Sequence, residues 1–342
     1  MRPLFEPAAL GPLRLANRVV LSPMTRMQAH EDGTPTEAMA RYYARYARHG
    51  VALVTTEAAY IDDAASRAYF NQPGMTGPRH AAGWKRIVEA VHAAGRPIVL
   101  QLQHGGRLSE PGLHACALGA SGEPPAGSSW QGGKPYAGAP LRAATQPERD
   151  SIVRAFAAAA RRARECGFDG VEVHGARGYL LDEFLSQPGL ALAERLAMPC
   201  AVLRAVREAF PAGLLSFNLS LYKMDDVNYQ AAGGKAEVAA VARAVAASGV
   251  DALHVTTRRV LREEPYGEPL ARTVREAVPD AGLIVNGGIR TLEDAEAALA
   301  QTGAQCVALA RALLANPDWM ERARSGAPME KYAPGMERQP LE

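Results

Sequence analysis

Eight short apolar runs, each followed by a segment with helical periodicity, constrain this 342-residue chain more than any other feature. Runs of this kind are typical of parallel strands buried on both faces, and the helical segments supply the crossovers that such strands need. The pattern predicts an α/β fold, a parallel (β/α)8 TIM barrel formed by a single domain over residues 1–342. A doubly wound sheet would also alternate, but no GxGxxG follows the first strand. The predicted strands are Asn17–Ser22, Val51–Thr55, Pro97–Leu102, Val171–Val173, Leu214–Leu219, Ala252–Thr256, Leu283–Asn286 and Cys306–Leu309.

Two segments depart from the simple alternation. Residues 103–145 are rich in Gly, Pro and Ser, and we interpret them as an insertion over the active-site face that contains a small hairpin. A surface excursion with no role is the alternative. Residues Ala193–Phe210 have helical periodicity, but Pro199 predicts a kink or a second start there.

Composition argues against several classes of protein. A net charge of +2 gives no reason to expect nucleic-acid or membrane-surface binding. No stretch approaches the roughly 20 apolar residues of a membrane span, and the first residues lack a signal peptide's apolar core. The four cysteines form no CxxC pair, so we expect neither a metal site nor a disulfide framework. A reduced cytoplasmic protein is the simplest interpretation.

Three polar side chains follow the fourth predicted strand. His174, Arg177 and Tyr179 lie where that strand meets a helix beginning at Leu180. In parallel barrels this carboxyl edge carries the chemistry. Each residue alone is explained as well by a satisfied turn or by packing, but the three together favour a site.

Other strand ends carry residues suited to a phosphorylated ligand. Gly287 and Gly288 follow the seventh strand, and Ala310 and Arg311 follow the eighth, where barrels usually bind phosphate. A tight turn alone would explain the glycines but not Arg311. Gln101, and Thr25 after the first strand, offer hydrogen bonds to a flat heterocycle, although each is explained equally well as a polar strand end satisfied by its neighbours.

Together these segments resemble the old yellow enzyme family of FMN-dependent ene-reductases and NADH:flavin oxidoreductases. The matching segments cover most of the barrel in order. They are Asn17–Arg26, Asp32–Glu37, Gln101–Arg107, Gly170–Leu185, Val285–Arg290 and Ala315–Asp318.

The resemblance implies a noncovalent FMN, reduced by NADH or NADPH, that passes hydride to an activated alkene. It implies that His174 and Arg177 hold the substrate's carbonyl oxygen and that Tyr179 delivers the proton. It also implies a homo-oligomer, a dimer or a larger assembly, with a small molecule as substrate. The positions implied for FMN are Pro23, Met24, Thr25, Ala58, Gln101, Asn218, Gly287, Gly288, Ala310 and Arg311.

Three departures from the family pattern fall at the predicted active site. Arg177 stands where the family has histidine or asparagine, which introduces a permanent charge. Asn218 stands where the fifth strand normally carries an arginine beside the flavin, so we expect a lower reduction potential. The loop after Ser186 is shortened.

Two other functions remain open from the sequence. The chain is either a reductase, or an FMN-dependent isomerase or dehydrogenase with an altered site, or a non-catalytic barrel that has lost FMN and binds a phosphorylated ligand.

Overall fold

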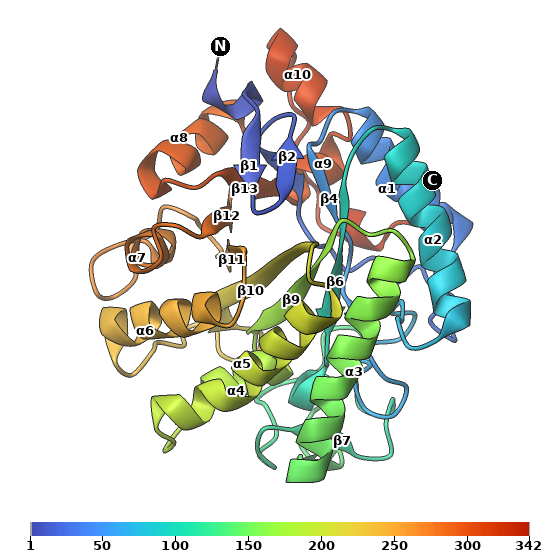
Figure 1. Ribbon diagram of the computed structural model, residues 1–342, viewed down its shortest axis with the longest axis vertical. Helices are drawn as coiled ribbons and strands as arrows, with labels where there is room; N and C mark the ends of the chain where they lie inside the picture. The colour runs from blue at the N-terminus through green and yellow to red at the C-terminus, as the bar shows by residue number, and fades with distance from the viewer. Residues whose placement is uncertain (1, 342) are drawn as a thin grey trace.

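The computed structural model describes residues 2–341, whose central strands form a closed parallel barrel with helices around it (Figure 1). Neighbouring strands follow the order β4-β3-β13-β12-β11-β10-β9-β6, and β6 pairs with β4 to close the ring. This confirms the predicted (β/α)8 TIM barrel. The barrel strands are β3 (Val19–Leu21), β4 (Leu53–Thr55), β6 (Ile98–Gln103), β9 (Gly170–Arg177), β10 (Leu214–Lys223), β11 (Ala252–Thr256), β12 (Gly282–Asn286) and β13 (Cys306–Leu309).

The helices cover the outside of the barrel, and a threonine side chain caps the start of α1 (Glu37–Arg48) and of α8 (Leu292–Thr302). Thr291 Oγ1 accepts a hydrogen bond from Asp294 N, and Thr291 N donates one to Asp294 Oδ2, so α8 starts with a reciprocal cap. Among residues 2–341, no helix is long and apolar enough to cross a membrane. The helices are α1 (Glu37–Arg48), α2 (Pro78–Ala93), α3 (Gln146–Glu165), α4 (Leu180–Leu185), α5 (Leu192–Ala209), α6 (Gly234–Ala247), α7 (Leu270–Ala277), α8 (Leu292–Thr302), α9 (Arg311–Ala315) and α10 (Trp319–Ser325).

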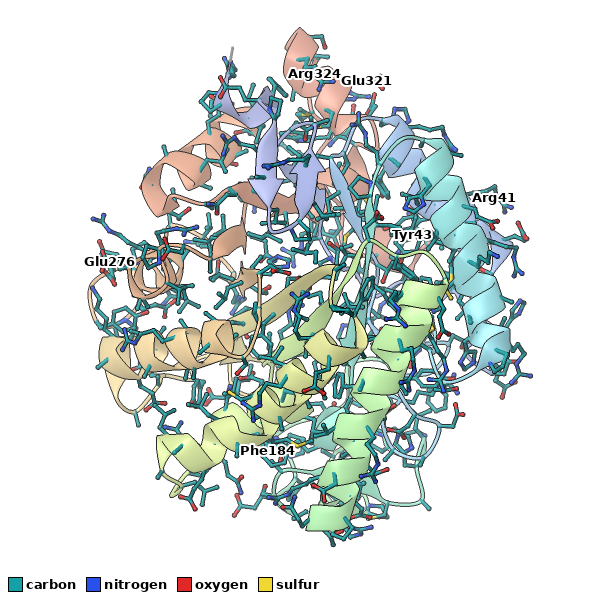
Figure 2. The ribbon with its side chains drawn as sticks, viewed as in Figure 1. Arg41, Tyr43, Phe184, Glu276, Glu321 and Arg324 are labelled. Carbon is teal, nitrogen blue, oxygen red and sulfur yellow. The ribbon has the colours of Figure 1, made fainter. Side chains whose placement is uncertain are left out.

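Apolar packing closes the amino-terminal end of the barrel. Strands β1 (Ala8–Leu10) and β2 (Leu13–Leu15) form an antiparallel hairpin whose leucines pack on Val20, Ile284 and other residues of the barrel strands. A second, larger core lies between the strands and the helices. Figure 2 shows Tyr43 of α1 directed toward the strands, while Arg41 of the same helix points outward. The carboxyl ends of the strands are therefore left to carry the site.

Several predicted boundaries were wrong. Strand β9 continues past His174 to Arg177, and β10 continues to Lys223, past the predicted end of that strand at Leu219. Helix α5 runs through Pro199 without a second start. Pro199 is buried at this position, so its packing helps to offset the backbone hydrogen bond that proline cannot donate.

The segment between β6 and α3 holds a second small sheet. Strands β7 (Ala117–Gly119) and β8 (Leu141–Ala143) pair in parallel. Between them in the sequence, Ser128 and Pro135 form an antiparallel bridge, and Tyr136 N donates to Gly127 O at 3.2 Å, within the segment predicted to contain a small hairpin. A parallel pair needs a long connection, which residues 120–140 supply. The remaining short elements are β5 (Ala59–Tyr60) and 3-10 turns at Pro3–Phe5, Gly106–Leu108 and Met336–Arg338.

Candidate active site

A buried polar network lies inside the barrel below the carboxyl ends of the strands. The carboxylate of Glu172 on β9 accepts hydrogen bonds from Gln101 Nε2 at 2.8 Å and from Asn218 Nδ2 at 3.3 Å. It also binds His254 Nδ1 at 2.9 Å and Ser216 Oγ at 3.2 Å. Strand register produces this grouping, because Gln101 and Ser216 both pair across from Glu172.

The hydrogen bonds of this network stabilise the negatively charged form of Glu172. Burial alone would raise the Glu172 pKa, but the interactions with His254, Gln101 and Asn218 outweigh it and hold the pKa below its usual value. Asn286 Nδ2 donates to His254 Nε2, so the ring proton of His254 sits on Nδ1 and points to Glu172. Sequence reasoning missed Glu172. The polar residues at inward positions of neighbouring strands were the signal that could have found it.

The side-chain amide of Asn218 uses both its oxygen and its nitrogen within this network. Its amide oxygen accepts from Thr256 Oγ1 at 2.9 Å, and its nitrogen donates to Glu172. By contrast, no described residue donates a hydrogen bond to Gln101 Oε1, whose amide nitrogen is fixed on Glu172. Gln101 therefore presents an acceptor to whatever occupies the barrel mouth.

His174 and Tyr179 form the first part of the predicted substrate site. Their rings pack edge to face, with centroids 5.2 Å apart and planes at 86°. Ala176 N donates to His174 Nδ1 at 3.3 Å, so the neutral ring carries its proton on Nε2. Burial and then the charge of Arg177 lower the His174 pKa to about 3. The imidazole is consequently uncharged at neutral pH and donates a hydrogen bond through Nε2.

Tyr179 stays protonated beside it. Burial raises the Tyr179 pKa, and the nearby charge of Arg177 opposes that rise only in part. The phenol therefore holds its proton at neutral pH and can donate it.

Arg177 completes the group in an unusual backbone conformation. Its φ angle is +61°, in the left-handed region that non-glycine residues seldom adopt. Two hydrogen bonds hold it there, from Arg177 N to Ser220 Oγ at 2.9 Å and from Met224 N to Arg177 O at 3.0 Å. The guanidinium carbon lies 5.7 Å from the ring centre of Tyr222.

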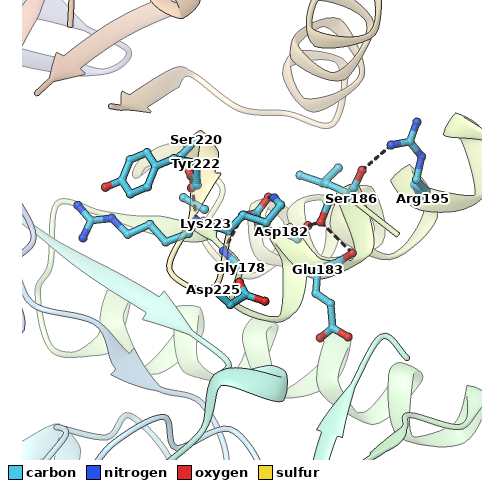
Figure 3. Close-up of polar contacts among 12 residues, drawn as sticks. Gly178, Asp182, Glu183, Ser186, Arg195, Ser220, Tyr222, Lys223 and Asp225 are labelled. Carbon is cyan, nitrogen blue, oxygen red and sulfur yellow. Dashed lines mark hydrogen bonds and ion pairs between the residues drawn. The ribbon is translucent and has the colours of Figure 1, made fainter. Parts of the chain in front are cut away.

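An ion pair supports the turn between Arg177 and Tyr179. Lys223 Nζ lies 2.8 Å from Asp182 Oδ1, and both side chains are only 3% exposed. The other oxygen, Asp182 Oδ2, accepts from Gly178 N at 2.6 Å. Figure 3 shows Asp182 beside both Gly178 and Lys223. The strand that carries Lys223 thereby fixes the turn that presents Tyr179.

A second buried carboxylate supports the loop after β3. Glu57 Oε2 accepts from Arg26 N at 2.9 Å and from Met27 N at 3.2 Å, while Glu57 N donates to Tyr43 Oη at 2.9 Å. Burial raises the Glu57 pKa to about 7 against these hydrogen bonds. Pro23, Met24 and Thr25 precede this anchor and stay partly exposed.

The predicted phosphate site lies on the ends of β12 and β13. Gly287 has a φ angle of +127°, and a Cβ there would come within 2.3 Å of Thr257 Oγ1, so only glycine fits. Gly288, with φ +70°, is exposed. Arg311, at the first turn of α9 after Ala310, has no carboxylate partner among residues 2–341 and lies 5.4 Å from the ring centre of Tyr332.

Comparison with known proteins identifies the family. The sequence profile described as the NADH:flavin oxidoreductase / NADH oxidase family matches residues 3–330. The chain belongs to this family. The resemblance to the old yellow enzymes is therefore confirmed, and the chain is an FMN-dependent oxidoreductase of the ene-reductase type.

Individual relatives agree with that assignment. The chain is 32% identical to flavin oxidoreductase hxnT of Emericella nidulans, over 97% of this chain and 93% of the relative. It is 30% identical to the NADH oxidase of Thermoanaerobacter brockii over 94% of its length, but it spans only 51% of that protein. The solved structure of morphinone reductase in complex with tetrahydroNAD superposes with a TM-score of 0.86 at 30% identity, covering 99% of this chain and 95% of that one.

The residues present fit the FMN of this family of oxidoreductases. Among the described residues, Gln101 Oε1 is a free acceptor at the carboxyl end of the barrel. Pro23, Met24 and Thr25 are partly exposed. Arg311 lacks an anionic partner in the described chain. Ala58 is buried, and its carbonyl accepts from Gln72 Nε2 at 3.0 Å. A planar ring above the network and a phosphate at β12 and β13 match this distribution of donors and acceptors.

Proposed function

We propose that this FMN-dependent oxidoreductase uses NADH or NADPH to reduce the activated C=C bond of a small α,β-unsaturated carbonyl compound. The observation that carries the proposal is the grouping of His174, Arg177 and Tyr179 at the end of β9, with the rings of His174 and Tyr179 5.2 Å apart. Two hydrogen-bond donors and a protonated phenol at one strand end are what addition across such a bond requires.

The side chains divide the work according to their chemistry. Bound FMN supplies the hydride. His174 Nε2–H and the Arg177 guanidinium donate to the substrate oxygen and stabilise the negative charge that develops there. Tyr179 delivers a proton to the neighbouring carbon, and its proton is replaced from water. Because the His174 pKa is about 3, the imidazole contributes a hydrogen bond rather than a charge.

The cofactor contacts in this proposal come from six strands or the loops that follow them. Gln101 Oε1 faces the ring, and Asn218 supports Gln101 indirectly through their shared partner Glu172. Arg311 holds the phosphate by charge. The proposed ring contacts are Pro23, Met24, Thr25, Ala58, Gln101 and Asn218, and the proposed phosphate contacts are Gly287, Gly288, Ala310 and Arg311.

Anaerobic spectroscopy tests the function. The purified protein is expected to show flavin absorbance that NADH or NADPH bleaches within seconds, and an added enone should restore it while the alkene is saturated. Comparing the two reductants decides which nucleotide is preferred. A colourless protein that cannot be reconstituted with FMN would contradict the proposal and favour the phosphate-binding barrel.

One observation favours a second function. Asn218 is bound to Thr256 and Glu172, so β10 places no cation at the flavin position where relatives carry arginine. Without that cation the reduced flavin is less stabilised, and an isomerase or dehydrogenase would tolerate this. Double-bond migration or desaturation of the substrate, in place of net reduction, would support this function.

We also propose that residues 103–145 cover the active-site face. Ser121 N donates to Glu183 Oε1 at 3.0 Å, which ties the segment to α4, and Tyr136 Oη donates to Leu108 O at 3.2 Å, which joins two parts of the segment itself. A cytoplasmic homo-oligomer is proposed from the family resemblance and from four cysteines without disulfides. Light scattering on the eluted protein measures the oligomer directly.

A further inference from the structure

The guanidinium of Arg177 has no counter-ion within residues 2–341. None of its N–H groups donates a hydrogen bond to a protein acceptor, and no carboxylate oxygen lies within 4.0 Å. The acids around it are already engaged. Asp182 binds Lys223 at 2.8 Å, and Asp225 binds Arg107 at 2.8 Å. The face of Tyr222 attracts the cation but fills none of its five donors.

The backbone gives no reason for an arginine at this position. A φ angle of +61° is favoured by glycine and asparagine rather than by arginine. Hydrogen bonds with Ser220 and Met224 hold the backbone of Arg177 in this conformation. Backbone strain at a site is a reason to look for function in the side chain that accepts it. The advantage of arginine must therefore lie in its charge and its paired donors.

The hydrogen-bond donors of Arg177 and of its neighbour His174 determine which substrate group can bind here. His174 is neutral and offers one N–H from Nε2, while the guanidinium offers a planar pair of donors. A ketone oxygen accepts from these groups but leaves the positive charge unmatched. A carboxylate satisfies the charge, and its two oxygens match the planar donors.

We propose that Arg177 makes this enzyme selective for 2-enoates, substrates whose activating group is itself a carboxylate. This inference rests on the proposed function and narrows it to a substrate class. The 2-enoate gains a hydride at its β-carbon and a proton from Tyr179 at its α-carbon. NADH is oxidised to NAD⁺, one proton is taken from water, and the product is the saturated carboxylate. The extra negative charge that builds on the carboxylate during hydride addition is what Arg177 neutralises.

Binding without turnover is the first test. Isothermal titration of the oxidised holoenzyme with 3-phenylpropanoate, and with its neutral isostere 4-phenylbutan-2-one, is expected to show tighter binding of the carboxylate. Arg177→Gln should weaken carboxylate binding by about 30-fold or more and leave ketone binding within a few fold. Arg177→Lys should keep part of the preference, since it keeps the charge but loses the planar pair.

Turnover is the second test, with the matching alkenes cinnamate and 4-phenylbut-3-en-2-one. The wild type is expected to have the higher kcat/KM for cinnamate, and Arg177→Gln should reverse the order. Arg204→Gln is the matched control, because Arg204 is exposed on α5 and makes no ion pair in the described chain. It should behave as wild type for both compounds.

The outcomes separate this inference from the proposed function. If the enzyme reduces the ketone but binds the two saturated compounds equally, the carboxylate inference is overturned and the reductase stands. If neither NADH nor NADPH reduces the flavin while carboxylate binding still depends on Arg177, the reductase fails and the anion site stands. Equal carboxylate binding by wild type and Arg177→Gln overturns the inference in either case.

Discussion

Replacing Lys223 with methionine should reveal how much the buried ion pair contributes to the active-site turn. The change removes the cation 2.8 Å from Asp182 Oδ1 at a position where both side chains are 3% exposed. A buried carboxylate left without its partner typically costs about 3–5 kcal/mol of unfolding free energy. Lys223→Met should therefore lose about that much at pH 8, as measured by urea unfolding followed by circular dichroism.

The loss should depend on pH in a defined direction. Burial already raises the Asp182 pKa in the wild type, with Lys223 opposing it, so removal of Lys223 raises that pKa further. A carboxyl whose folded pKa exceeds its unfolded value takes up a proton on folding. The variant is therefore least destabilised below the unfolded pKa of about 4 and becomes less stable as pH rises toward the folded pKa. The destabilisation at pH 5 should be smaller than at pH 8.

Two comparison variants make this reasoning refutable. Lys235→Met removes a lysine that is 47% exposed and pairs with Glu268 and Glu276, so solvent screening should keep its loss of stability well below that of Lys223→Met. Adding Asp182→Asn to Lys223→Met should recover stability, because the amide oxygen still accepts from Gly178 N without a charge. Equal losses in the two lysine variants, or simple additivity in the double variant, would refute the account.

Three further predictions concern the other charged groups. Since burial raises the Glu57 pKa from 4.5 to about 7, folding takes up a proton there, and stability should fall by about 3 kcal/mol between pH 4.5 and 7 in the wild type relative to Glu57→Gln. Glu172→Gln removes the negative charge bound to Gln101 and should raise the flavin midpoint potential, measured by dye equilibration; an unchanged or lower potential would count against that charge acting on the flavin. Arg311→Gln should weaken FMN binding to the apoprotein about tenfold by fluorescence titration, whereas unaltered affinity would remove Arg311 from the phosphate site.

The barrel was predictable because its strands are consecutive apolar runs. The ends of those strands were not. The predicted fifth strand ended at Leu219, before Tyr222 and Lys223, and an isolated lysine is costly to bury. Only the folded chain brings Asp182 within 2.8 Å of Lys223 and makes a buried strand position acceptable. Strand β9 extends to Arg177 for a similar reason, because Ser220 on β10 binds its backbone N–H.

The site was predictable only where its residues stand close together in sequence. His174, Arg177 and Tyr179 share one strand end, and the structure brings the rings of His174 and Tyr179 into contact. In the sequence, Glu172 between Val171 and Val173 fits the ordinary alternation of polar and apolar residues along a strand. Its importance depends on partners from β6, β10 and β11, whose register a single sequence does not specify.

The oxidative half-reaction tests the central claim most directly. Enzyme reduced anaerobically with NADH is mixed with an activated alkene, and the return of flavin absorbance is followed in wild type and Tyr179→Phe. The account predicts that the wild type reoxidises rapidly with a saturated product. Tyr179→Phe should be reduced by NADH at the wild-type rate but reoxidise at least about 100-fold more slowly. Equal reoxidation rates in the two proteins, or an alkene returned unsaturated, would contradict it.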